Sequence, residues 1–193
     1  METRDRIITA FYNLAAEQGF TRATVDELAR RNGMSKRTIY RHFNSKENLV
    51  EAVLLQFMRE AEEKINQCLD SSDNPIEKMT SFIRLISEKL STLNPQMLQD
   101  MQRHYPHLWE KVEQFRADKV KKIIIDKILL QGIEEGYFKK INPEIVAASM
   151  LATIRAVINP TFVLENNLTI EQAFNSVFDT FLHGIVSNEK CKM

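Results

Sequence analysis

Apolar residues recur along most of this chain at the three- and four-residue spacing of helices that bury one face. The pattern is clear over residues 4–18, 49–69, 76–90 and 170–185. No segment alternates between apolar and polar residues as a half-buried strand does. The pattern therefore predicts an all-α fold of about nine helices.

Glycine and proline mark the expected ends of these helices. Gly19 should close the first helix, and Gly136 should close a long helix that begins at about Pro106. A further helix is expected over about 141–158, because Pro160 follows it. These breaks separate the helical stripes without dividing the chain into repeats.

Two short helices joined by a glycine turn are predicted near the N-terminus. The sequence Thr24-Val-Asp-Glu27 fits a capping box at the start of the first. Gly33 suits a left-handed turn position, where a Cβ would be costly. Ser35 is a plausible N-cap for the second helix, over about 36–42, and Asn44 or Ser45 is expected to cap the long helix that follows. This is the layout of a helix-turn-helix that docks into the major groove of DNA.

The charge distribution supports this interpretation. The formal net charge of the chain is zero, yet residues 1–48 hold nine Lys and Arg against six Asp and Glu. Residues 49–193 hold 17 and 20 respectively. The segment 35–46 contains four cations and no acid. The cationic character needed to bind a polyanion is thus confined to the predicted helix-turn-helix.

The side chains of this segment are the candidates for DNA contacts. Lys36 and Arg37, at the start of the second helix, can reach guanine O6 and N7, and Thr38 can touch a thymine methyl. The others can bind phosphates or sit at helix starts, where free N–H groups attract anions. Each residue alone has a plainer interpretation as a solvated surface group, but the combination favours DNA binding. The full set is Thr24, Ser35, Lys36, Arg37, Thr38, Tyr40, His42 and Lys46.

The stretch TVDELARRNGMSKRTIYRHF, followed by SKENL, resembles the N-terminal signature of TetR-type (TetR/AcrR) transcriptional regulators. The resemblance covers about residues 4–54 and is strongest over 39–47. It implies a DNA-binding domain at 1–48 and an effector-binding and dimerisation domain at 49–193. It also implies a homodimer on a palindromic operator, usually repressing until a small-molecule effector binds. In this family position 37 often carries a small residue or proline, so the main base reader is Lys36 or Arg37.

The last two helices are the candidates for dimerisation. Their apolar stripes fit an ordinary core within one chain equally well, and the resemblance favours an interface built from two helices of each subunit. The predicted interface residues are Leu151, Ile154, Phe174, Val177, Phe178 and Phe181.

A mixture of methionine, aromatic and polar residues marks a possible effector pocket, because ligand sites combine such groups. Arg155 can pair with an anionic effector or form an ordinary salt bridge, and the aromatic residues also suit a core. The predicted pocket residues are Met101, Tyr105, Trp109, Arg155 and Asn159.

The sequence gives no support for catalysis, a cofactor or a metal site. It lacks nucleophile-elbow, phosphate-loop and HExxH motifs, and His104 and His107 have no third ligand nearby. Cys68 and Cys191 lack metal-ligand spacing and are expected to be free thiols.

We also expect a cytoplasmic protein without a membrane partner. No apolar run approaches the roughly 20 residues that span a bilayer, and the N-terminus lacks a signal-peptide core. Two alternatives stay open: a helical small-molecule-binding protein or enzyme with a vestigial DNA-binding head, and a DNA compactor that ignores sequence.

Overall fold

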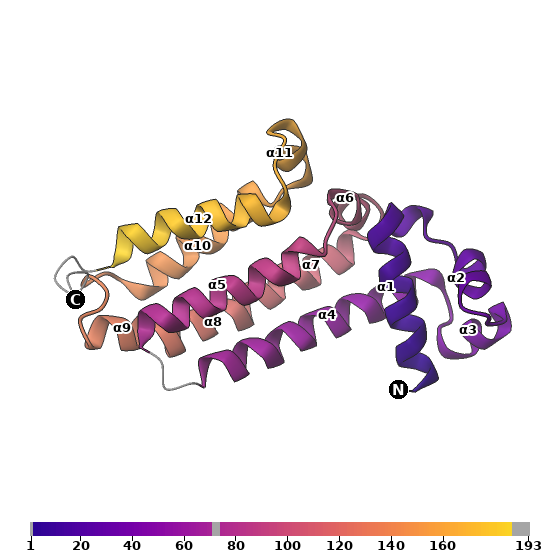
Figure 1. The fold of residues 1–193 in the computed structure, drawn as a ribbon, viewed down its shortest axis with the longest axis horizontal. Coiled ribbons are helices and arrows are strands. Elements are labelled where there is room, and N and C mark those ends of the chain that lie inside the picture. The colour runs from indigo at the N-terminus through magenta and orange to yellow at the C-terminus, as the bar shows by residue number, and fades with distance from the viewer. Residues whose placement is uncertain (1, 71–73, 187–193) are drawn as a thin grey trace. The chain divides into compact units, whose positions relative to one another are not determined.

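The computed structural model describes residues 2–70 and 74–186, which are almost entirely helical (Figure 1). Within these residues the only β pairing is an isolated bridge between Phe138 and Val186. The predicted all-α fold is confirmed. Among the described residues, no helix combines the length and apolar character needed to cross a bilayer.

The helices follow one another with short connections, and one of them is a long rod of five consecutive segments. In the rod, two π-helical segments alternate with α-helix. The helices are α1 (Thr3–Arg22), α2 (Val25–Arg31), α3 (Lys36–His42), α4 (Lys46–Leu69), α5 (Pro75–Ser91), α6 (Pro95–His104), the rod α7 (Pro106–Phe115), η1 (Arg116–Val120), α8 (Lys121–Ile124), η2 (Ile125–Leu129) and α9 (Leu130–Glu134), then α10 (Pro143–Val157), α11 (Pro160–Glu165) and α12 (Ile170–Ile185).

The chain forms two compact units. The head unit contains residues 2–59 and 92–112, and the body unit contains residues 60–70, 74–91 and 113–186. Because residues 92–112 join the head, this unit is larger than the helix-turn-helix alone. The division at residue 48 into a DNA-binding and an effector-binding domain concerns function and stays a prediction.

The head unit packs α1, α2, α3 and the first part of α4 around one apolar core. Phe11, Ile39 and Leu49 are fully buried in it. Met97 of α6 and Leu108 of α7 are buried in the same core, although they lie far along the chain. The short helices of the head are therefore held by tertiary packing, since isolated helices of seven residues are unstable in water.

The body unit is a helical bundle in which α12 packs against α5 and α10, and α10 also packs against α8 (Figure 1). Its core includes aromatic contacts: the ring centroids of Phe82 and Phe178 lie 6.1 Å apart, and those of Phe174 and Phe178 lie 4.6 Å apart. Such pairs add directional contacts to the apolar burial that stabilises the bundle.

The first helix behaves differently from the prediction at its C-terminal end. Gly19 adopts φ +84° and ψ 162°, which kinks the helix, and the chain then completes a further turn to Arg22. A Cβ at Gly19 would lie 2.7 Å from both the Asp100 carboxylate and the Gln96 side chain of α6. Glycine is required here both for the backbone conformation and for the close approach of α6.

The long helix predicted from Pro106 ends as expected before Gly136, which has φ +76°. Its two π-helical segments were not predicted, because apolar spacing does not reveal a single extra residue per turn. The six-residue helix α11 was also missed. It begins at Pro160, the residue expected only to end the preceding helix, and Asn159 caps it by accepting from the Thr161 N–H at 2.9 Å.

Candidate DNA-binding site

The turn between α2 and α3 is fixed by local hydrogen bonds. Thr24 Oγ1 accepts from the Glu27 N–H at 3.2 Å at the start of α2. Gly33 has φ +61°, as predicted for the left-handed turn. Ser35 Oγ then accepts from the Thr38 N–H at 3.0 Å and caps α3. These contacts set where α3 begins, and thus which side chains its N-terminal end presents.

The predicted capping box is only half formed, so the reciprocal part of that prediction is wrong. The Glu27 carboxylate turns away from Thr24 and accepts from Gln18 Nε2 at 2.9 Å and Arg31 Nε at 3.0 Å. The hydrogen bond from Gln18, followed by that from Arg31, holds the pKa of Glu27 below its ordinary value. Glu27 therefore ties α2 to α1 instead of closing its own helix end.

The N-cap of α4, predicted to be Asn44 or Ser45, is Ser45. Its Oγ accepts from the Asn48 N–H at 3.1 Å, at the start of α4. Glu47 consequently occupies the second helical position, where an acid still favours the helix start.

The helix α3 has only one buried side chain, Ile39. The cations Lys36, Arg37 and Arg41 are exposed, and so is Tyr40, with 48% of its surface accessible. Tyr40 is therefore not part of the core. A short helix held by one buried residue and covered with donors is suited to enter a groove lined by hydrogen-bond acceptors.

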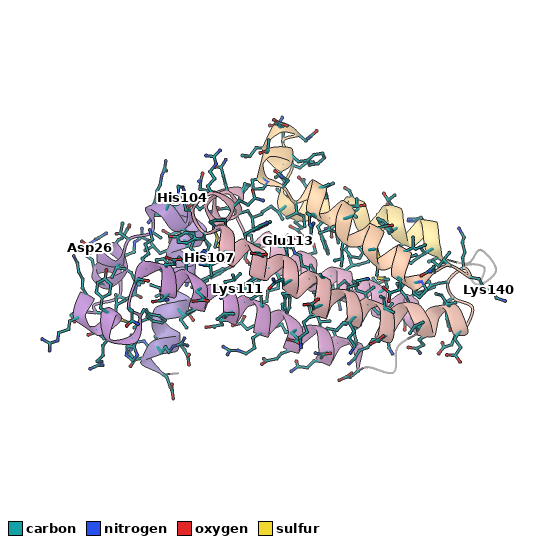
Figure 2. All side chains as sticks on the ribbon, turned by 180° about the vertical axis from the view of Figure 1, so that it is seen from behind. Asp26, His104, His107, Lys111, Glu113 and Lys140 are labelled. Atoms are coloured by element: carbon teal, nitrogen blue, oxygen red, sulfur yellow. The ribbon has the colours of Figure 1, made fainter. Side chains whose placement is uncertain are left out.

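The two candidate base readers differ in their surroundings. Lys36 Nζ lies 2.6 Å from Asp26 Oδ1 in an exposed ion pair. Asp26 belongs to α2 and is labelled in Figure 2. Arg37 makes no ion pair with any other described residue. Lys36 must leave Asp26 before it can bind DNA, whereas the Arg37 guanidinium is available without rearrangement.

The Lys46 side chain is hydrogen-bonded to the backbone at the C-terminal end of α1. Its Nζ donates to the Thr21 carbonyl at 2.8 Å, and the Thr21 N–H donates to Asp100 Oδ2 at 2.7 Å. Desolvation lowers the pKa of Lys46, and the charge of Asp100 partly offsets this. A phosphate contact by Lys46 would replace a hydrogen bond that it already makes.

A pocket of about 240 Å³ lies at the C-terminal end of α3. His42 contributes to it, and its Nε2 is buried without a hydrogen-bond partner among the described residues. Arg4 also contributes, with its guanidinium 5.3 Å from the centroid of the Phe43 ring. Arg4 was not among the site residues predicted from the sequence. The lining residues are Arg4, His42, Phe43, Asn44, Asn48, Glu51, Ala52 and Leu55.

The predicted effector residues do not form one cluster within either unit. Met101 is buried in the core of the head, and Tyr105 and Trp109 pack against the same core. Burial raises the pKa of Tyr105, and the charges of Asp100 and Glu47 add to this. Tyr105 and Trp109 thus belong to the packing of the head, which was the second interpretation of these residues.

The two predicted pocket residues of the body unit already have partners. Arg155 pairs with Glu113, which is the salt-bridge alternative for this residue. The Asn159 side chain is exposed and caps α11.

Most of the predicted dimer residues are buried inside one chain. Four of them are at most 7% exposed, as expected for an ordinary core within one chain: Ile154, Phe174, Val177 and Phe178. Leu151 and Phe181 are half-buried. The solvent-facing side of α10 carries different residues, namely Ile145, Ala148, Ser149, Ala152, Arg155 and Ala156.

One histidine of the α6–α7 region, His107 of α7, pairs with an acid. His107 Nε2 lies 3.0 Å from Glu47 Oε1 in an exposed pair, and Figure 2 labels His104 and His107. Within the described residues no three His, Cys, Asp or Glu side chains gather closely enough to hold a metal ion. Cys68 is a free thiol, and Cys191 lies outside the described residues.

Comparison with known proteins extends these observations. Residues 7–53 match the family model of bacterial regulatory proteins of the tetR family. The uncharacterized HTH-type transcriptional regulator YvaF of Bacillus subtilis (strain 168) is 26% identical over 186 residues, 96% of each chain. The HTH-type transcriptional repressor KstR2 of Mycolicibacterium smegmatis is 29% identical over 140 residues, 70% of this chain and 67% of the relative.

The fold agrees with that of solved regulators. The TetR family transcriptional regulator PfmR from Thermus thermophilus superposes with a TM-score of 0.67 at 23% identity, covering 93% of this chain and 98% of the other. The matched segment 7–53 contains the capped turn and the exposed α3 described above. This chain is a helix-turn-helix transcriptional regulator of the TetR family.

Proposed function

We propose that the chain represses transcription as a homodimer on a palindromic operator and that a small-molecule effector releases it. The exposed, cation-bearing face of α3 on its capped turn carries this proposal. A side chain placed there by a rigid scaffold can distinguish bases, whereas flexible basic tails bind phosphate without discrimination.

Within the DNA contact we assign Arg37 as the main base reader. It is exposed and makes no ion pair with the residues that the structure describes, and bidentate binding to guanine is worth about 1–3 kcal/mol of discrimination. Lys36 reads a second base after leaving Asp26, and Thr38 packs on a thymine methyl. The residues assigned to position the phosphates are Thr24, Ser35, Tyr40, His42 and Lys46.

For the dimer we propose that the exposed face of α10 packs against the same face of a second copy. Three of its residues, Ala148, Ala152 and Ala156, are small enough for helices to approach closely. Leu151 and Phe181 can add partial burial. A two-fold dimer presents two recognition helices to successive major grooves, about 34–36 Å apart or a multiple of this, which is why the operator is expected to be palindromic.

The effector is proposed to bind the body unit and to favour a state whose paired heads no longer fit the operator. Such coupling is typically about 1–3 kcal/mol. We also propose that the protein is cytoplasmic, where bacterial transcription takes place, and that it acts by binding and not as an enzyme. The alternative, a small-molecule-binding protein or enzyme with a vestigial head, has less support because the exposed cations of α3 would then have no role.

A selection from random duplexes, followed by binding measurements on the enriched sequence, tests this function. We expect an excess of specific over non-specific affinity of about 10³-fold or more. Arg37→Ala should relax the preference at one base pair of each half-site, and Arg84→Ala, an exposed arginine of α5, serves as the matched control. Equal affinity for all duplexes would show a sequence-independent DNA binder instead.

A further inference from the structure

The pocket at the C-terminal end of α3, called the head pocket below, lies wholly within the head unit. Its lining residues come from the first turn of α1, from the end of α3 and the residues that follow it, and from the first turns of α4. Its volume of about 240 Å³ is far larger than the roughly 10–15 Å³ that a single water needs. The head pocket therefore has room for a larger polar group.

Hydrogen-bond donors line the head pocket beside α3. The Arg4 guanidinium lies 5.3 Å from the centroid of the Phe43 ring, a contact that holds the cation in place. Arg4 makes no ion pair with the residues that the structure describes. The side chains of Asn44 and Asn48 are exposed, and Asn48 uses its Oδ1 to accept from Ser45 Oγ at 3.2 Å. The amide N–H groups of both asparagines are thus available to a ligand.

His42 adds a polar atom whose partner must come from outside the described chain. Its Nε2 is buried, and no described residue forms a hydrogen bond with it. Leaving a buried polar atom without a partner is costly, so a group that enters the head pocket and supplies one is stabilised there. In the Nε2–H form the imidazole can donate to an oxygen of that group.

The charges around the head pocket favour an anion. Its one lining acid, Glu51, forms an ion pair with Lys111 of α7, which Figure 2 labels and which does not line the pocket. The charge of Glu51 is therefore offset, and the charge of Arg4 is not. Guanidinium, amide and imidazole N–H groups all bind phosphate oxygens, so this set of donors matches a phosphate group.

The place of the head pocket on α3 matches the expected path of the DNA backbone. A recognition helix turns its N-terminal end toward the base edges. The seven residues of α3 span about 10 Å, and the major groove is about 8.5 Å deep. With Lys36 and Arg37 at the bases, His42 at the other end of the helix reaches the edge of the groove, where the phosphates lie. Ala52 and Leu55, farther along α4, offer apolar surface to a deoxyribose.

We propose that the head pocket holds one phosphate of the DNA backbone at the edge of each half-site, with Arg4 as its charged ligand and Asn44 and Asn48 as neutral donors. His42 gains its missing partner in the same contact. The DNA contact then extends beyond the helix-turn-helix to α1, and it anchors the C-terminal end of α3 while the N-terminal end reads bases. This proposal deepens the proposed function, on which it rests.

Single methylphosphonates, each of which removes one backbone charge of the selected duplex, test the site in the full chain. At the bound phosphate the wild type should lose about three- to tenfold in affinity, and Arg4→Gln should lose less than about twofold because its contact is already absent. Arg6→Gln is the matched control. Arg6 is an exposed arginine two residues farther along, on the other side of α1, and it does not line the pocket, so this variant should keep the wild-type loss.

The salt dependence of binding gives a second readout, which a change in packing alone does not move. The slope of log affinity against log salt concentration should fall by about 0.9 in Arg4→Gln and should be retained in Arg4→Lys. If Arg4→Gln does not fold, Asn44→Asp decides, because it places a carboxylate at an exposed position of the head pocket. This variant should bind the methylphosphonate duplex at least as tightly as the unmodified one.

The proposal is overturned if Arg4→Gln keeps the wild-type loss at every methylphosphonate position, or if Arg6→Gln abolishes the same loss. Inorganic phosphate, titrated without DNA and followed by the NMR signals of the His42 ring, tests for a free anion. If its binding depends on Arg4 while no position on DNA does, the head pocket is a site for free phosphate and the DNA contact is wrong. If selection yields no specific duplex, the proposed function fails, and the salt slope on random duplexes still decides whether Arg4 contacts a phosphate.

Discussion

The head and body units arrange their cations differently. In the head, Arg37 and Arg41 extend from α3 into solvent, and Arg37 has no acidic partner among the described residues. Ion pairs also occur in the head, at Arg31, Lys36 and Lys111, while in the body six cations of the described residues pair with acids of the same unit. The pairs there are Lys89–Glu60, Lys119–Glu62, Lys121–Glu144, Lys127–Asp70, Arg116–Glu113 and Arg155–Glu113.

This difference separates two uses of charge on one chain with no net charge. Unmatched, exposed cations attract an external polyanion, whereas internal pairs connect helices to one another. Exposed pairs such as Lys127–Asp70 contribute little to stability, while the largely buried pair Arg116–Glu113 is costly to break. The comparison therefore predicts that charge removal affects DNA binding in the head and folding in the body.

The largest effect is expected from Glu113→Gln. It leaves Arg116 in a largely buried position with less compensation, which should lower the free energy of unfolding by about 2–4 kcal/mol. Glu17→Gln, which removes an exposed partner of Arg31 in the head, should cost less than about 1 kcal/mol. Denaturant unfolding measures both; equal losses would remove the distinction between the units.

Gly19→Ala should destabilise the head by about 1–3 kcal/mol. The backbone there is essentially restricted to glycine, and the new Cβ would press on Asp100 and Gln96. Gly184→Ala is the control, because Gly184 lies in α12 and a Cβ added there would meet no atom of another described helix or loop within 4 Å. It should raise stability by about 0.5–1 kcal/mol through helix propensity. Thermal unfolding of both variants checks this, and equal melting temperatures would contradict it.

The two base readers should differ in binding to the selected duplex. Arg37→Ala should lose about 1–3 kcal/mol of discrimination at one base pair, more than Lys36→Ala loses. Asp26→Asn should tighten binding severalfold by freeing Lys36 and removing a negative charge near the phosphates. Affinities for a panel of single-base variants measure these effects. If Arg37→Ala instead lowers the affinity for every duplex of the panel equally, Arg37 contacts phosphates and does not read a base.

Lys46→Ala should weaken binding to all duplexes alike and flatten the dependence of affinity on salt by about one phosphate contact. The structure adds a condition, because Lys46 donates to the Thr21 carbonyl. If Lys46 keeps this bond in the complex, the salt slope will stay unchanged while thermal stability falls. Filter binding at several salt concentrations separates the two outcomes.

The smallest effect concerns Glu27. Its pKa is lowered in the folded chain, so its contribution to stability is present above the unfolded value of about 4.5 and is lost as pH falls through the lower folded value. In Gln18→Ala, which removes the largest cause, the pKa should move back toward 4.5. Carboxyl chemical shifts followed by NMR give the two values, and identical titrations would assign the shift to Arg31.

The helix-turn-helix could be predicted in detail because its signals are local. The caps at Thr24 and Ser35 and the turn at Gly33 act within a few residues. Contacts between distant residues could not be predicted, including the approach of Asp100 to Gly19 and the placement of Met101 in the head core.

The body unit shows the limit of periodicity. The stripe containing Phe174 and Phe178 correctly predicts a helix with one buried face, but it does not tell whether that face meets the same chain or a partner. Here the same chain covers it. The exposed face of α10, on which three of the six residues named above are alanine, gave no comparable signal because small residues carry little hydrophobic contrast.

The π-helical segments of the rod have a consequence for insertions and deletions. A π turn holds one residue more than the α-helical path over the same length. Deleting one residue between Arg116 and Val120 can convert η1 to regular α-helix and keep the later faces of the rod in register. The same deletion within α5 would rotate every following side chain by about 100°. The rod can therefore lose a single residue at either of its two π-helical segments without repacking the bundle.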